Sequence, residues 1–465
     1  MEFKEYSHIF MLGIGGIGMS ALARYFKLKG KFVAGFDRVN TQLTQTLENE
    51  GFTILYKDNV DEIPYDFSIP EKTLVIYTPA IKNDNTLLTY FFQRQFKVFK
   101  RAEILGRIAL EYKTIAVAGT HGKTTITAMV SHLLHQSAVE VNAMVGGIMK
   151  NYQSNFIASA KSEFLVTEAD EYDRSFLKLY PHFAVITACD ADHLDIYGTE
   201  EELLKAYGKF ADQVSAEGLL LTKKGLQLNV QNASVTRKYT YSVNDRSADI
   251  YPDHLQFNEN MISFDLVTPQ GVLEKLTMQP TGLMNVENAV AATFIALQAG
   301  ADRDEIKEVL STFKGVRRRF DMLYNDNETI YIDDYAHHPQ EIRSLVKSVK
   351  SIYPSRHITG IFQPHLFSRT LNFADEFARS LEQLDTIILL DIYPAREKPI
   401  EGVNSAFLFK KINHNNKFLF ARDETIEYLL HHHFEVLLTI GAGDIDTLAQ
   451  PLLKMIRHKK VIKEK

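Results

Sequence analysis

The sequence contains little of what marks secreted, membrane-spanning or nucleic-acid-binding proteins. Its one cysteine, Cys189, excludes an internal disulfide and fits a reducing compartment. The longest apolar stretch, residues 9–23, is interrupted by four glycines, whereas a membrane span needs about 20 mostly apolar residues. The N-terminal residues MEFKEYSHIF lack the basic region of a signal peptide. Basic residues are not in excess, because 52 Lys and Arg against 58 Asp and Glu give a net charge of −6. We therefore expect a cytoplasmic protein that binds neither membranes nor nucleic acid.

The length and patterning predict an α/β protein of three domains. A chain of 465 residues corresponds to three domains at roughly 150 residues each. Short apolar runs alternate with helical patterns, which indicates parallel sheets flanked by helices. We predict domain boundaries near Lys113, where a second strand–loop–helix unit starts, and near Gly315. The predicted domains are a Rossmann-like domain (1–112), a central P-loop-type domain (113–314) and a second Rossmann-like domain (315–465). The central domain is expected to contain a small antiparallel β insertion between about residues 218 and 279.

The first glycine-rich segment, residues 13–18, has the spacing G-x-G-x-x-G between a predicted strand and a predicted helix. Its first glycine allows a tight turn, and its second lets the main chain approach a diphosphate whose charge faces the amides of the helix N-terminus. Asp37 follows Gly18 by nineteen residues, close to the spacing of the acidic residue in dinucleotide-binding folds. The segment predicts a bound diphosphate without identifying the nucleotide; NAD is the common default, and a turn needed only for packing is the alternative.

The second glycine-rich segment, residues 119–125, reads GTHGKTT and also lies between a predicted strand and a predicted helix. It departs from the strict P-loop spacing because Val117 stands where the first glycine should be. The segment can still bind a nucleoside triphosphate despite this difference. Main-chain amides can surround phosphates, Lys123 can reach the β and γ oxygens, and the Thr124 hydroxyl can bind Mg²⁺. A chance match in a structural turn is the alternative, but the position between strand and helix favours ATP.

Acidic residues follow two predicted strands of the central domain. Glu168, Asp170 and Glu171 end one strand, and Asp192 and His193 follow another. Oxygen ligands with one imidazole suit a hard dication, and these strand ends could face the second loop. For any single carboxylate, a solvated loop is the simpler interpretation, and Asp170 and Glu171 are the weaker candidates. The joint occurrence predicts a metal site.

The third domain has two clusters of ionisable residues at consecutive strand ends, which favours a site there. Before the first strand, Arg319 could neutralise charge on a transferring phosphate, whereas Arg317 fits a basic linker. The clusters are DDYAHHP at residues 333–339 and QPH at residues 363–365, with Arg369 four residues further on. Together with two different phosphate loops, they suit an enzyme that joins two substrates at the expense of ATP, one of them carrying a diphosphate.

Twelve segments, in order along nearly the whole chain, resemble motifs of the Mur ligase family. They read GIGGIGMSALA, KRAEILG, AVAGTHGKTT, VGGIMKN, EADEYDRSF, DADHLD, NVENAVAA, GVRRRFD, DDYAHHP, FQPHLFSRT, DIYPAREKPIEGV and GAGD. The resemblance is closest to members that join L-alanine to UDP-N-acetylmuramate in peptidoglycan synthesis. It implies a three-domain enzyme that uses ATP and Mg²⁺, phosphorylates the muramyl carboxylate, and lets the amine of L-alanine displace the phosphate.

The resemblance also implies roles for individual residues. The implied contacts to UDP-N-acetylmuramate are Gly15, Gly16, Ile17, Gly18, Ser20 and Asp37. The implied ATP site comprises Gly119, Thr120, His121, Gly122, Lys123, Thr124 and Thr125, with Asn288 and Asp334 beside adenosine and Arg319 near the γ-phosphate. Thr124, Glu168 and His193 would lie near the metal ions, and His337 and Arg369 around the amino acid. The implied catalytic residues are Lys123, Glu168, His193, Arg319 and His337.

The sequence departs from the family pattern at three positions and leaves alternatives open. Leu366 replaces a frequent second arginine, Met284 a usual histidine and Ala188 a usual asparagine; each is expected to be lineage variation. Some relatives carry a carbamylated lysine that binds metal, and neither Lys205 nor Lys209 can be assigned to that position. The alternative functions are a sister ligase that attaches a recycled tripeptide to the same sugar, a nicotinamide-dependent oxidoreductase, and a catalytically silent relative. The oligomeric state is left open.

Overall fold

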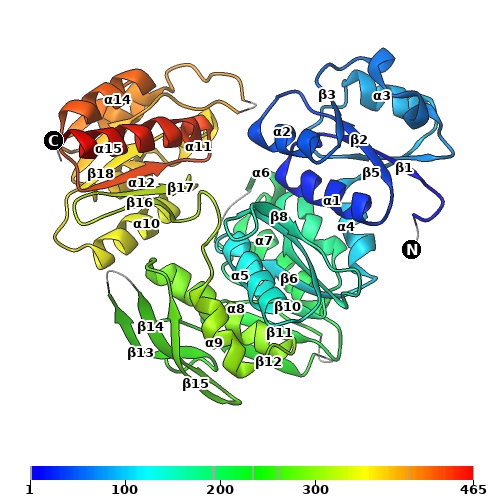
Figure 1. The fold of residues 1–465 in the computed structure, drawn as a ribbon, viewed down its shortest axis with the longest axis horizontal. Coiled ribbons are helices and arrows are strands. Elements are labelled where there is room, and N and C mark those ends of the chain that lie inside the picture. The colour runs from blue at the N-terminus through cyan, green and yellow to red at the C-terminus, as the bar shows by residue number, and fades with distance from the viewer. Residues whose placement is uncertain (1–2, 191–193, 233–234, 259–260, 396, 464–465) are drawn as a thin grey trace. The chain divides into compact units, whose positions relative to one another are not determined.

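A computed structural model describes residues 3–190, 194–232, 235–258, 261–395 and 397–463. The fold is mixed α/β, with three larger sheets and one smaller sheet (Figure 1). The chain divides into two compact units, and each is described separately below. The first unit comprises residues 1–254, 264–277 and 287–313, and the second comprises residues 255–263, 278–286 and 314–465.

The N-terminal sheet has the strand order β3-β2-β1-β4-β5, and all its strands are parallel. Its strands are β1 (His8–Leu12), β2 (Phe32–Phe36), β3 (Thr53–Leu55), β4 (Thr73–Tyr77) and β5 (Lys97–Lys100). Its helices are α1 (Ile17–Leu28), α2 (Gln42–Asn49), η1 (Val60–Glu62), η2 (Tyr65–Ser68), α3 (Thr86–Gln93) and α4 (Arg101–Ala109). The strand order reverses at β1, and ligands of open α/β sheets bind at such a switch point. The first glycine loop follows β1 directly.

The central sheet has the order β12-β11-β10-β6-β9-β7-β8, with only β8 antiparallel to its neighbour among the pairs with a described register. Its strands are β6 (Lys113–Ala118), β7 (Val141–Met149), β8 (Ser154–Ile157), β9 (Phe164–Ala169), β10 (Phe183–Ile186), β11 (Leu219–Lys223) and β12 (Arg237–Tyr241). The helices are α5 (Lys123–Gln136), η3 (Tyr172–Lys178), α6 (Leu194–Tyr197) and α7 (Glu200–Asp212). Because β6 lies between β9 and β10, the second glycine loop emerges between the two acidic strand ends.

The predicted antiparallel insertion is smaller than expected. β11 and β12 run parallel to β10 and extend the central sheet. The insertion is the separate sheet of β13 (Tyr251–Phe257), β14 (Ile262–Thr268) and β15 (Gly271–Met278). The connections between these neighbours are too short for a parallel crossover, so the strands run antiparallel. Helices α8 (Leu283–Gln298) and α9 (Arg303–Ser311) follow.

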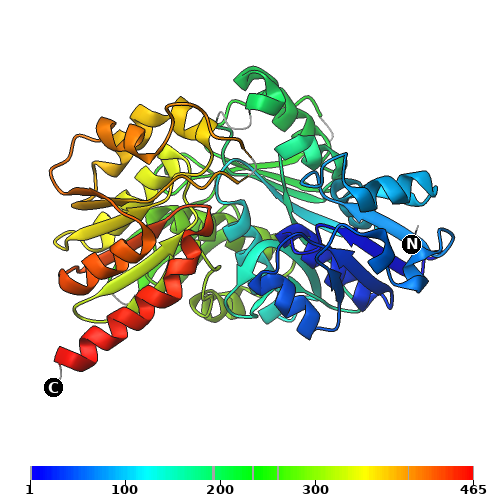
Figure 2. The same ribbon diagram turned by 90° about the horizontal axis from the view of Figure 1, so that it is seen from above.

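The C-terminal sheet has the order β16-β17-β21-β18-β19-β20, with β16 antiparallel to β17 and the others parallel. Its strands are β16 (Asp321–Asn325), β17 (Ile330–Asp334), β18 (Ile358–Phe362), β19 (Thr386–Leu389), β20 (Lys417–Leu419) and β21 (Val436–Ile440). Its helices are α10 (Pro339–Ile352), α11 (Phe367–Asn372), α12 (Ala374–Leu381), α13 (Ser405–Lys411), α14 (Arg422–His431), η4 (Asp444–Leu448) and α15 (Ala449–Lys463), which ends the chain (Figure 2). Because β21 separates β17 from β18, the loops after these three strands meet at one edge of the sheet.

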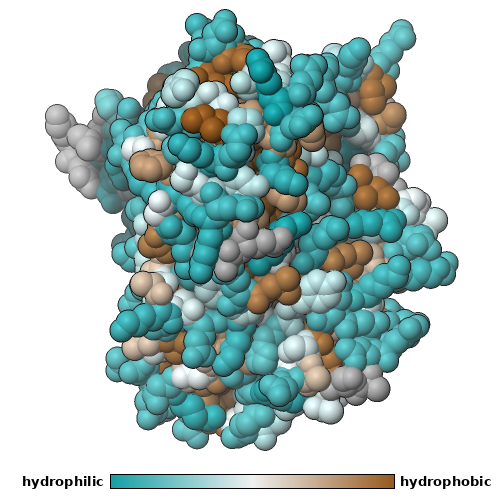
Figure 3. Space-filling model, turned by 90° about the vertical axis from the view of Figure 1, so that its right-hand side faces the viewer, coloured by the Kyte–Doolittle hydropathy of each residue, from teal (hydrophilic) through white to brown (hydrophobic). Residues whose placement is uncertain are grey.

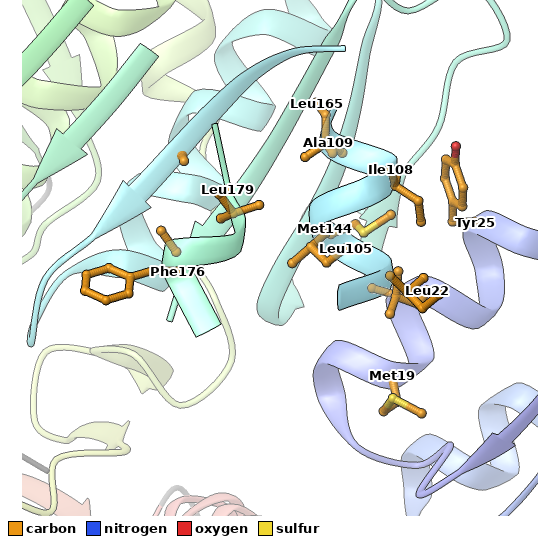
Figure 4. Packing of buried hydrophobic residues seen from close by; sticks show 14 of the residues in the cluster. Met19, Leu22, Tyr25, Leu105, Ile108, Ala109, Met144, Leu165, Phe176 and Leu179 are labelled. Carbon is orange, nitrogen blue, oxygen red and sulfur yellow. The ribbon is translucent and has the colours of Figure 1, made fainter. Parts of the chain in front are cut away.

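The first two sheets share one hydrophobic core. Met19, Leu22 and Tyr25 of α1 and Leu105 and Ile108 of α4 belong to the same buried cluster as side chains of the central sheet (Figure 4). The approach of α4 to η3 is close, because a Cβ on Gly106 would lie 2.6 Å from the carbonyl oxygen of Lys178. This packing holds the two glycine loops in one compact unit.

Polar contacts reinforce the junction of α1 with the central sheet. Asn155 of β8 is fully buried, and its amide donates to the Ile17 carbonyl (2.6 Å) and to the Ser20 hydroxyl (3.0 Å). Its side-chain oxygen accepts a hydrogen bond from Arg24, whose guanidinium also pairs with Glu50 at 2.7 Å. Since α1 carries the first glycine loop at its N-terminus, Asn155 ties that loop to the central sheet.

The face of the molecule in Figure 3 is predominantly hydrophilic. On the face in Figure 3, apolar side chains occur in small separate groups among polar ones. Within the part of the chain that the structure describes, no helix has the length and apolarity needed to cross a membrane.

We predict that Asn155→Ala destabilises the protein by about 2–3 kcal/mol, because it leaves one Arg24 donor and the Ser20 hydroxyl buried without this partner. Urea unfolding followed by circular dichroism would measure the loss. Asn244→Ala, which truncates an exposed asparagine, serves as the control and should change stability by less than about 0.5 kcal/mol. Equal stability of the two variants would contradict the role of Asn155.

Candidate active site

The first glycine loop connects β1 to α1 through a strained turn that only glycine accommodates. Gly13 has φ +86°, and a Cβ there would lie 2.5 Å from Cγ2 of Thr78. The amide of Gly15 donates to Oδ2 of Asp37 at 2.9 Å, and the amide of Val39 donates to Oδ1 of the same carboxylate at 3.2 Å. The structure therefore brings Asp37, at the end of β2, onto the loop predicted to bind a diphosphate.

Arg101 also borders this loop, and sequence reasoning assigned it no role. A Cβ on Gly18, in the first turn of α1, would lie 3.0 Å from Nη1 of Arg101. Arg101 follows β5 directly, at the carboxyl end of a parallel strand, where ligands of open α/β sheets bind. This position was the sequence signal that could have identified it. Its guanidinium forms a longer ion pair, 3.6 Å, with Asp170 of the central domain.

Ser20 occupies a different position from the other predicted residues of the first loop. Its side chain is fully buried, and its hydroxyl donates to the Ile17 carbonyl at 2.9 Å and accepts from Asn155. The structure thus places Ser20 in the junction between α1 and the central sheet. Gly16 is the N-cap of α1, and Ile17 is the first residue of the helix.

The second glycine loop connects β6 to α5, and two of its glycines have left-handed φ angles. Gly119 has φ +125° and packs against Thr187 and Ala188, so an added Cβ would lie 2.8 Å from the Ala188 amide. Gly122 has φ +80°, and a Cβ there would lie 2.7 Å from Oδ1 of Asn288. Asn288 of α8 is therefore brought against the loop, as the resemblance implied for a residue near the nucleotide.

Lys123, the first residue of α5, is held by a buried ion pair. Its Nζ lies 2.8 Å from both carboxylate oxygens of Glu171 and 2.6 Å from the carbonyl oxygen of Gly119. Glu171 is 1% exposed. Burial lowers the pKa of Lys123, but the charges of Glu171 and Asp170 outweigh burial and raise it, so the lysine is cationic. Glu171, considered above as a weak metal ligand, is thus the ion-pair partner of the loop lysine.

The rest of the second loop is also in contact with acidic residues. Asp190 lies 3.2 Å from Nε2 of His121 and accepts a hydrogen bond from the Thr120 hydroxyl at 3.3 Å. The hydrogen bond from His121 lowers the pKa of Asp190, although burial opposes it. The side chains of Thr124 and Thr125, in the first turn of α5, are buried.

Glu168 and Thr124 carry side-chain oxygens of the kind that Mg²⁺ prefers. Glu168 is the penultimate residue of β9, where it is paired with Val117 of β6, and its Oε1 accepts a hydrogen bond from the amide of Gly146 at 2.6 Å. The third predicted ligand, His193, lies outside the described residues. Over the described ranges, no group of three or more His, Cys, Asp and Glu side chains is arranged to hold a metal ion.

In the second unit, Asp334 lies at the end of β17 beside the arginine-rich segment. Its carboxylate accepts the amides of Phe320 (2.6 Å) and Ala336 (2.8 Å). Burial raises the pKa of Asp334 to about 6, against the opposing effects of these hydrogen bonds and of the Arg319 charge. The Arg319 guanidinium lies 4.9 Å from the ring centre of Tyr335. The structure thus places Arg319 close enough to Asp334 for its charge to act on that carboxylate. The resemblance implied separate contacts of these two residues, to the γ-phosphate and to adenosine.

Arg318 has a structural role. It donates to the carbonyls of Gly441 (2.6 Å) and Gly443 (3.1 Å), and its Nη1 lies 3.3 Å from Asp446. These contacts fasten the segment before β16 to the loop after β21. Arg317 is exposed, in agreement with a linker position.

His337, His365 and Arg369 form a cluster beyond the ends of β17 and β18. The rings of His337 and His365 lie 6.0 Å apart. Burial lowers the pKa of His337, with an opposing effect of Glu341 and a further lowering by Arg369. Burial, His337 and Arg369 likewise lower the pKa of His365, to about 4. Both imidazoles are therefore neutral at pH 7.

The neutral form of His337 has a defined proton position. Its Nδ1 lies 3.0 Å from the carbonyl oxygen of Tyr335, which can only accept a hydrogen bond. Nδ1 therefore carries the proton, and Nε2 has a free electron pair. This arrangement makes Nε2 of His337 a proton acceptor.

The three departures from the family pattern lie in different surroundings. Ala188 contributes its main-chain carbonyl, which accepts the Thr120 amide at 3.1 Å, and this bond does not depend on its side chain. Met284 is 36% exposed. Leu366 precedes α11 with φ +72°, and its amide donates to the Tyr393 carbonyl at 3.0 Å. Of the two lysines considered for carbamylation, Lys205 pairs with Glu201 and Glu202 at 2.9 Å, and Lys209 is exposed.

Comparison with known proteins gives matches along nearly the whole chain. The Mur ligase family catalytic domain matches residues 8–113, the Mur ligase middle domain residues 117–296, and the Mur ligase glutamate ligase domain residues 318–443. A UDP-N-acetylmuramate–L-alanine ligase of Parabacteroides distasonis is 46% identical over 98% of both chains. One from Porphyromonas gingivalis is 44% identical over 97% of this chain and 99% of its own.

Solved structures show the same fold. A UDP-N-acetylmuramate-alanine ligase, MurC, of Thermotoga maritima superposes with a TM-score of 0.81 at 26% identity, covering 97% of this chain and 99% of its own. A murein peptide ligase of Psychrobacter arcticus superposes with a TM-score of 0.68 at 21% identity, covering 97% of this chain and 98% of its own. At 21% identity, the similarity to the murein peptide ligase is a similarity of fold.

We predict that Asp333→Asn changes how stability depends on pH. Asp333 is 3% exposed, and burial raises its pKa to about 6, against the Thr439 hydrogen bond and the Arg318 charge. Between pH 4 and 6 the folded protein keeps a proton that the unfolded chain releases. The wild type should therefore lose about 3 kcal/mol of unfolding free energy relative to Asp333→Asn as the pH rises through this window. Urea unfolding at several pH values would measure the difference, and a relative gain by the wild type would contradict it.

Proposed function

Because the chain belongs to the Mur ligase family, we propose that it is an ATP-dependent ligase joining the lactyl carboxylate of UDP-N-acetylmuramate to L-alanine. Members of the family use ATP, and so does this chain. The observation that carries the proposal is the 46% identity, over 98% of both chains, to a ligase named for these two substrates. The product would serve peptidoglycan synthesis, and we place the reaction in the cytoplasm, where the single Cys189 would stay reduced.

The chemistry explains why two nucleotide sites are needed. A carboxylate is a poor electrophile, so its oxygen first attacks the γ-phosphorus of ATP, which gives an acyl phosphate and ADP. The amine of L-alanine, after losing a proton, then attacks the acyl carbon, and inorganic phosphate leaves with the C–O bond electrons. The protein contributes positioning and neutralisation of charge.

Residues of the first unit would bind both nucleotides. Gly15, Gly16, Ile17 and Gly18, with Asp37 on the same loop, would contact the UDP-sugar, whereas Ser20 would act through the packing of α1. The segment 119–125 and Asn288 would bind ATP, with Lys123 neutralising the phosphates. Thr124, Glu168 and His193 would hold Mg²⁺, which supplies further positive charge to the phosphates when bound.

Residues of the second unit would complete the reaction. Arg319 would neutralise charge at the γ-phosphate, and Asp334 would contact the adenosine. Arg369 would bind the carboxylate of L-alanine, and with Leu366 in place of a second arginine it would do so with fewer cations. The neutral His337 would accept the amine proton at Nε2 before the attack. The three family matches support the division into domains 1–112, 113–314 and 315–465.

The decisive test is product analysis by mass after UDP-N-acetylmuramate, MgATP and L-alanine are mixed with the protein. We expect the UDP-N-acetylmuramoyl-L-alanine mass, ADP and phosphate in equal amounts. A parallel reaction with the tripeptide tests the sister ligase, and faster phosphate release there would overturn the choice of L-alanine. NADH binding without ATP turnover would favour the oxidoreductase.

We predict that Lys123→Ala lowers ATP turnover at least about 1,000-fold, because the phosphates lose their main cationic partner. Phosphate release would measure the loss, with thermal unfolding as a check on folding because Glu171 loses its partner. The exposed Lys161→Ala is the control and should retain full activity. Full activity of Lys123→Ala would contradict the assignment of the second loop to ATP.

We predict that Arg369→Met raises the KM for L-alanine about 10- to 100-fold, since a charge-assisted contact to the carboxylate is lost. The KM values for ATP and the UDP-sugar should stay within about twofold. Arg343→Met, at an exposed position of α10, is the matched control. Steady-state kinetics with each substrate varied would show the pattern, and an unchanged KM for L-alanine would rule out this contact.

A further inference from the structure

Two successive acidic residues beyond β9 each pair with a cation at a different glycine loop. Glu171 pairs with Lys123 of the second loop at 2.8 Å, and Asp170 pairs at 3.6 Å with Arg101, which borders the first loop. Both pairs lie in the first compact unit. The mechanism proposed above uses neither carboxylate.

In the Glu171–Lys123 pair, Glu171 contacts the ammonium group that would bind the phosphates of ATP. Both oxygens of Glu171 contact Nζ of Lys123, and the main chain of Glu171 is fixed by Tyr197, whose hydroxyl donates to its carbonyl at 2.6 Å. A lysine at this point of a phosphate loop binds β and γ oxygens. Phosphate and Glu171 therefore compete for the same ammonium group, and a buried carboxylate next to bound phosphate is repelled by it.

At the first loop, Asp170 likewise pairs with a cation that a bound phosphate would contact, Arg101. Arg101 borders Gly18 in the first turn of α1, where the helix dipole is positive. A cation in that position is unfavourable unless an anion lies nearby, and in this structure Asp170 is such an anion. A diphosphate on the loop would meet both the amides of α1 and the Arg101 guanidinium.

We propose that Asp170 and Glu171 act as internal counter-anions for Arg101 and Lys123, and that each carboxylate releases its cation when phosphate oxygens bind at the corresponding loop. The inference rests on the proposed function and deepens it. Arg101 becomes a binding residue for the diphosphate of the UDP-sugar. Asp170 and Glu171 become positioning residues that keep the two cations in place while the loops are empty.

The proposal predicts that removing either carboxylate raises the affinity for a ligand, which is the opposite of the usual effect. Removing an ordinary structural residue weakens ligand binding, whereas removing a competing carboxylate strengthens it. The effects should also be separate, since Asp170 competes at the first loop and Glu171 at the second. Loss of Glu171 should lower the thermal stability of the empty protein while it increases the affinity for ATP.

The test is calorimetric titration of the full-length protein with UDP and, separately, with a non-hydrolysable ATP analogue and Mg²⁺. We expect Glu171→Gln to bind the ATP analogue about three- to tenfold more tightly and UDP within about twofold of the wild type. Asp170→Asn should bind UDP about two- to fivefold more tightly, with ATP within about twofold. Glu163→Gln is the matched control, because Glu163 pairs with Lys113 at 3.0 Å on the exposed surface.

A third variant tests the role of Arg101 directly. Arg101→Met should weaken UDP binding about tenfold and leave the ATP analogue unchanged, because the diphosphate loses a charge-assisted contact. Arg107→Met, on the same helix and over the ring of Phe99, is the control. UDP binding by the wild type should also weaken with added salt more steeply than binding by Arg101→Met.

Weaker ATP binding by Glu171→Gln, weaker UDP binding by Asp170→Asn, or equal effects of either variant on both ligands would overturn the proposal. If Glu171→Gln fails to fold, Asp170→Asn and Arg101→Met decide the outcome, since Asp170 is partly exposed. A wild type that binds UDP and ATP while its variants lack the separate pattern refutes this inference alone. A wild type that binds neither refutes the proposed function as well.

Discussion

The packing of α1 and α4 against the central sheet is the constraint on which the arrangement of the site depends. Each glycine loop is built locally, from a strand, a turn with left-handed glycines and a helix N-terminus, and could form in any α/β domain. The shared core and the Asn155 contacts put both loops into one compact unit. A reaction that passes a phosphoryl group from one bound molecule to another needs this relation between its two sites.

In this structure, carboxylates are paired with donors of both loops that are proposed to bind phosphate. Asp37 accepts the Gly15 amide, Glu171 holds Lys123, and Asp190 accepts from Thr120. Such donors are costly to bury without an acceptor, by about 1–3 kcal/mol each. Phosphate binding as proposed would exchange the carboxylate acceptor at Lys123 for a phosphate oxygen, so its net free energy would be a difference between two sets of hydrogen bonds.

The sequence was sufficient to predict both loops, because strand, glycine turn and helix are adjacent in the chain. The ion pair of Lys123 with Glu171 spans 48 residues, and local patterns do not specify which acid at a strand end meets which cation. Arg101 was missed, and the contact of Ser20 with Asn155 was not predicted, for the same reason. The parallel direction of β11 and β12 was also missed, since it is set by the connections and not by the alternation of side chains.

Gly119 shows how few substitutions the second glycine loop can accept. Its φ of +125° and the main chain of Ala188 together exclude every L-side chain at this position. The neighbouring contact, from the Thr120 amide to the Ala188 carbonyl, is made by backbone atoms alone. An inhibitor that engaged this stretch through its peptide groups would face a surface that amino-acid substitution can scarcely remodel, which limits the routes to resistance.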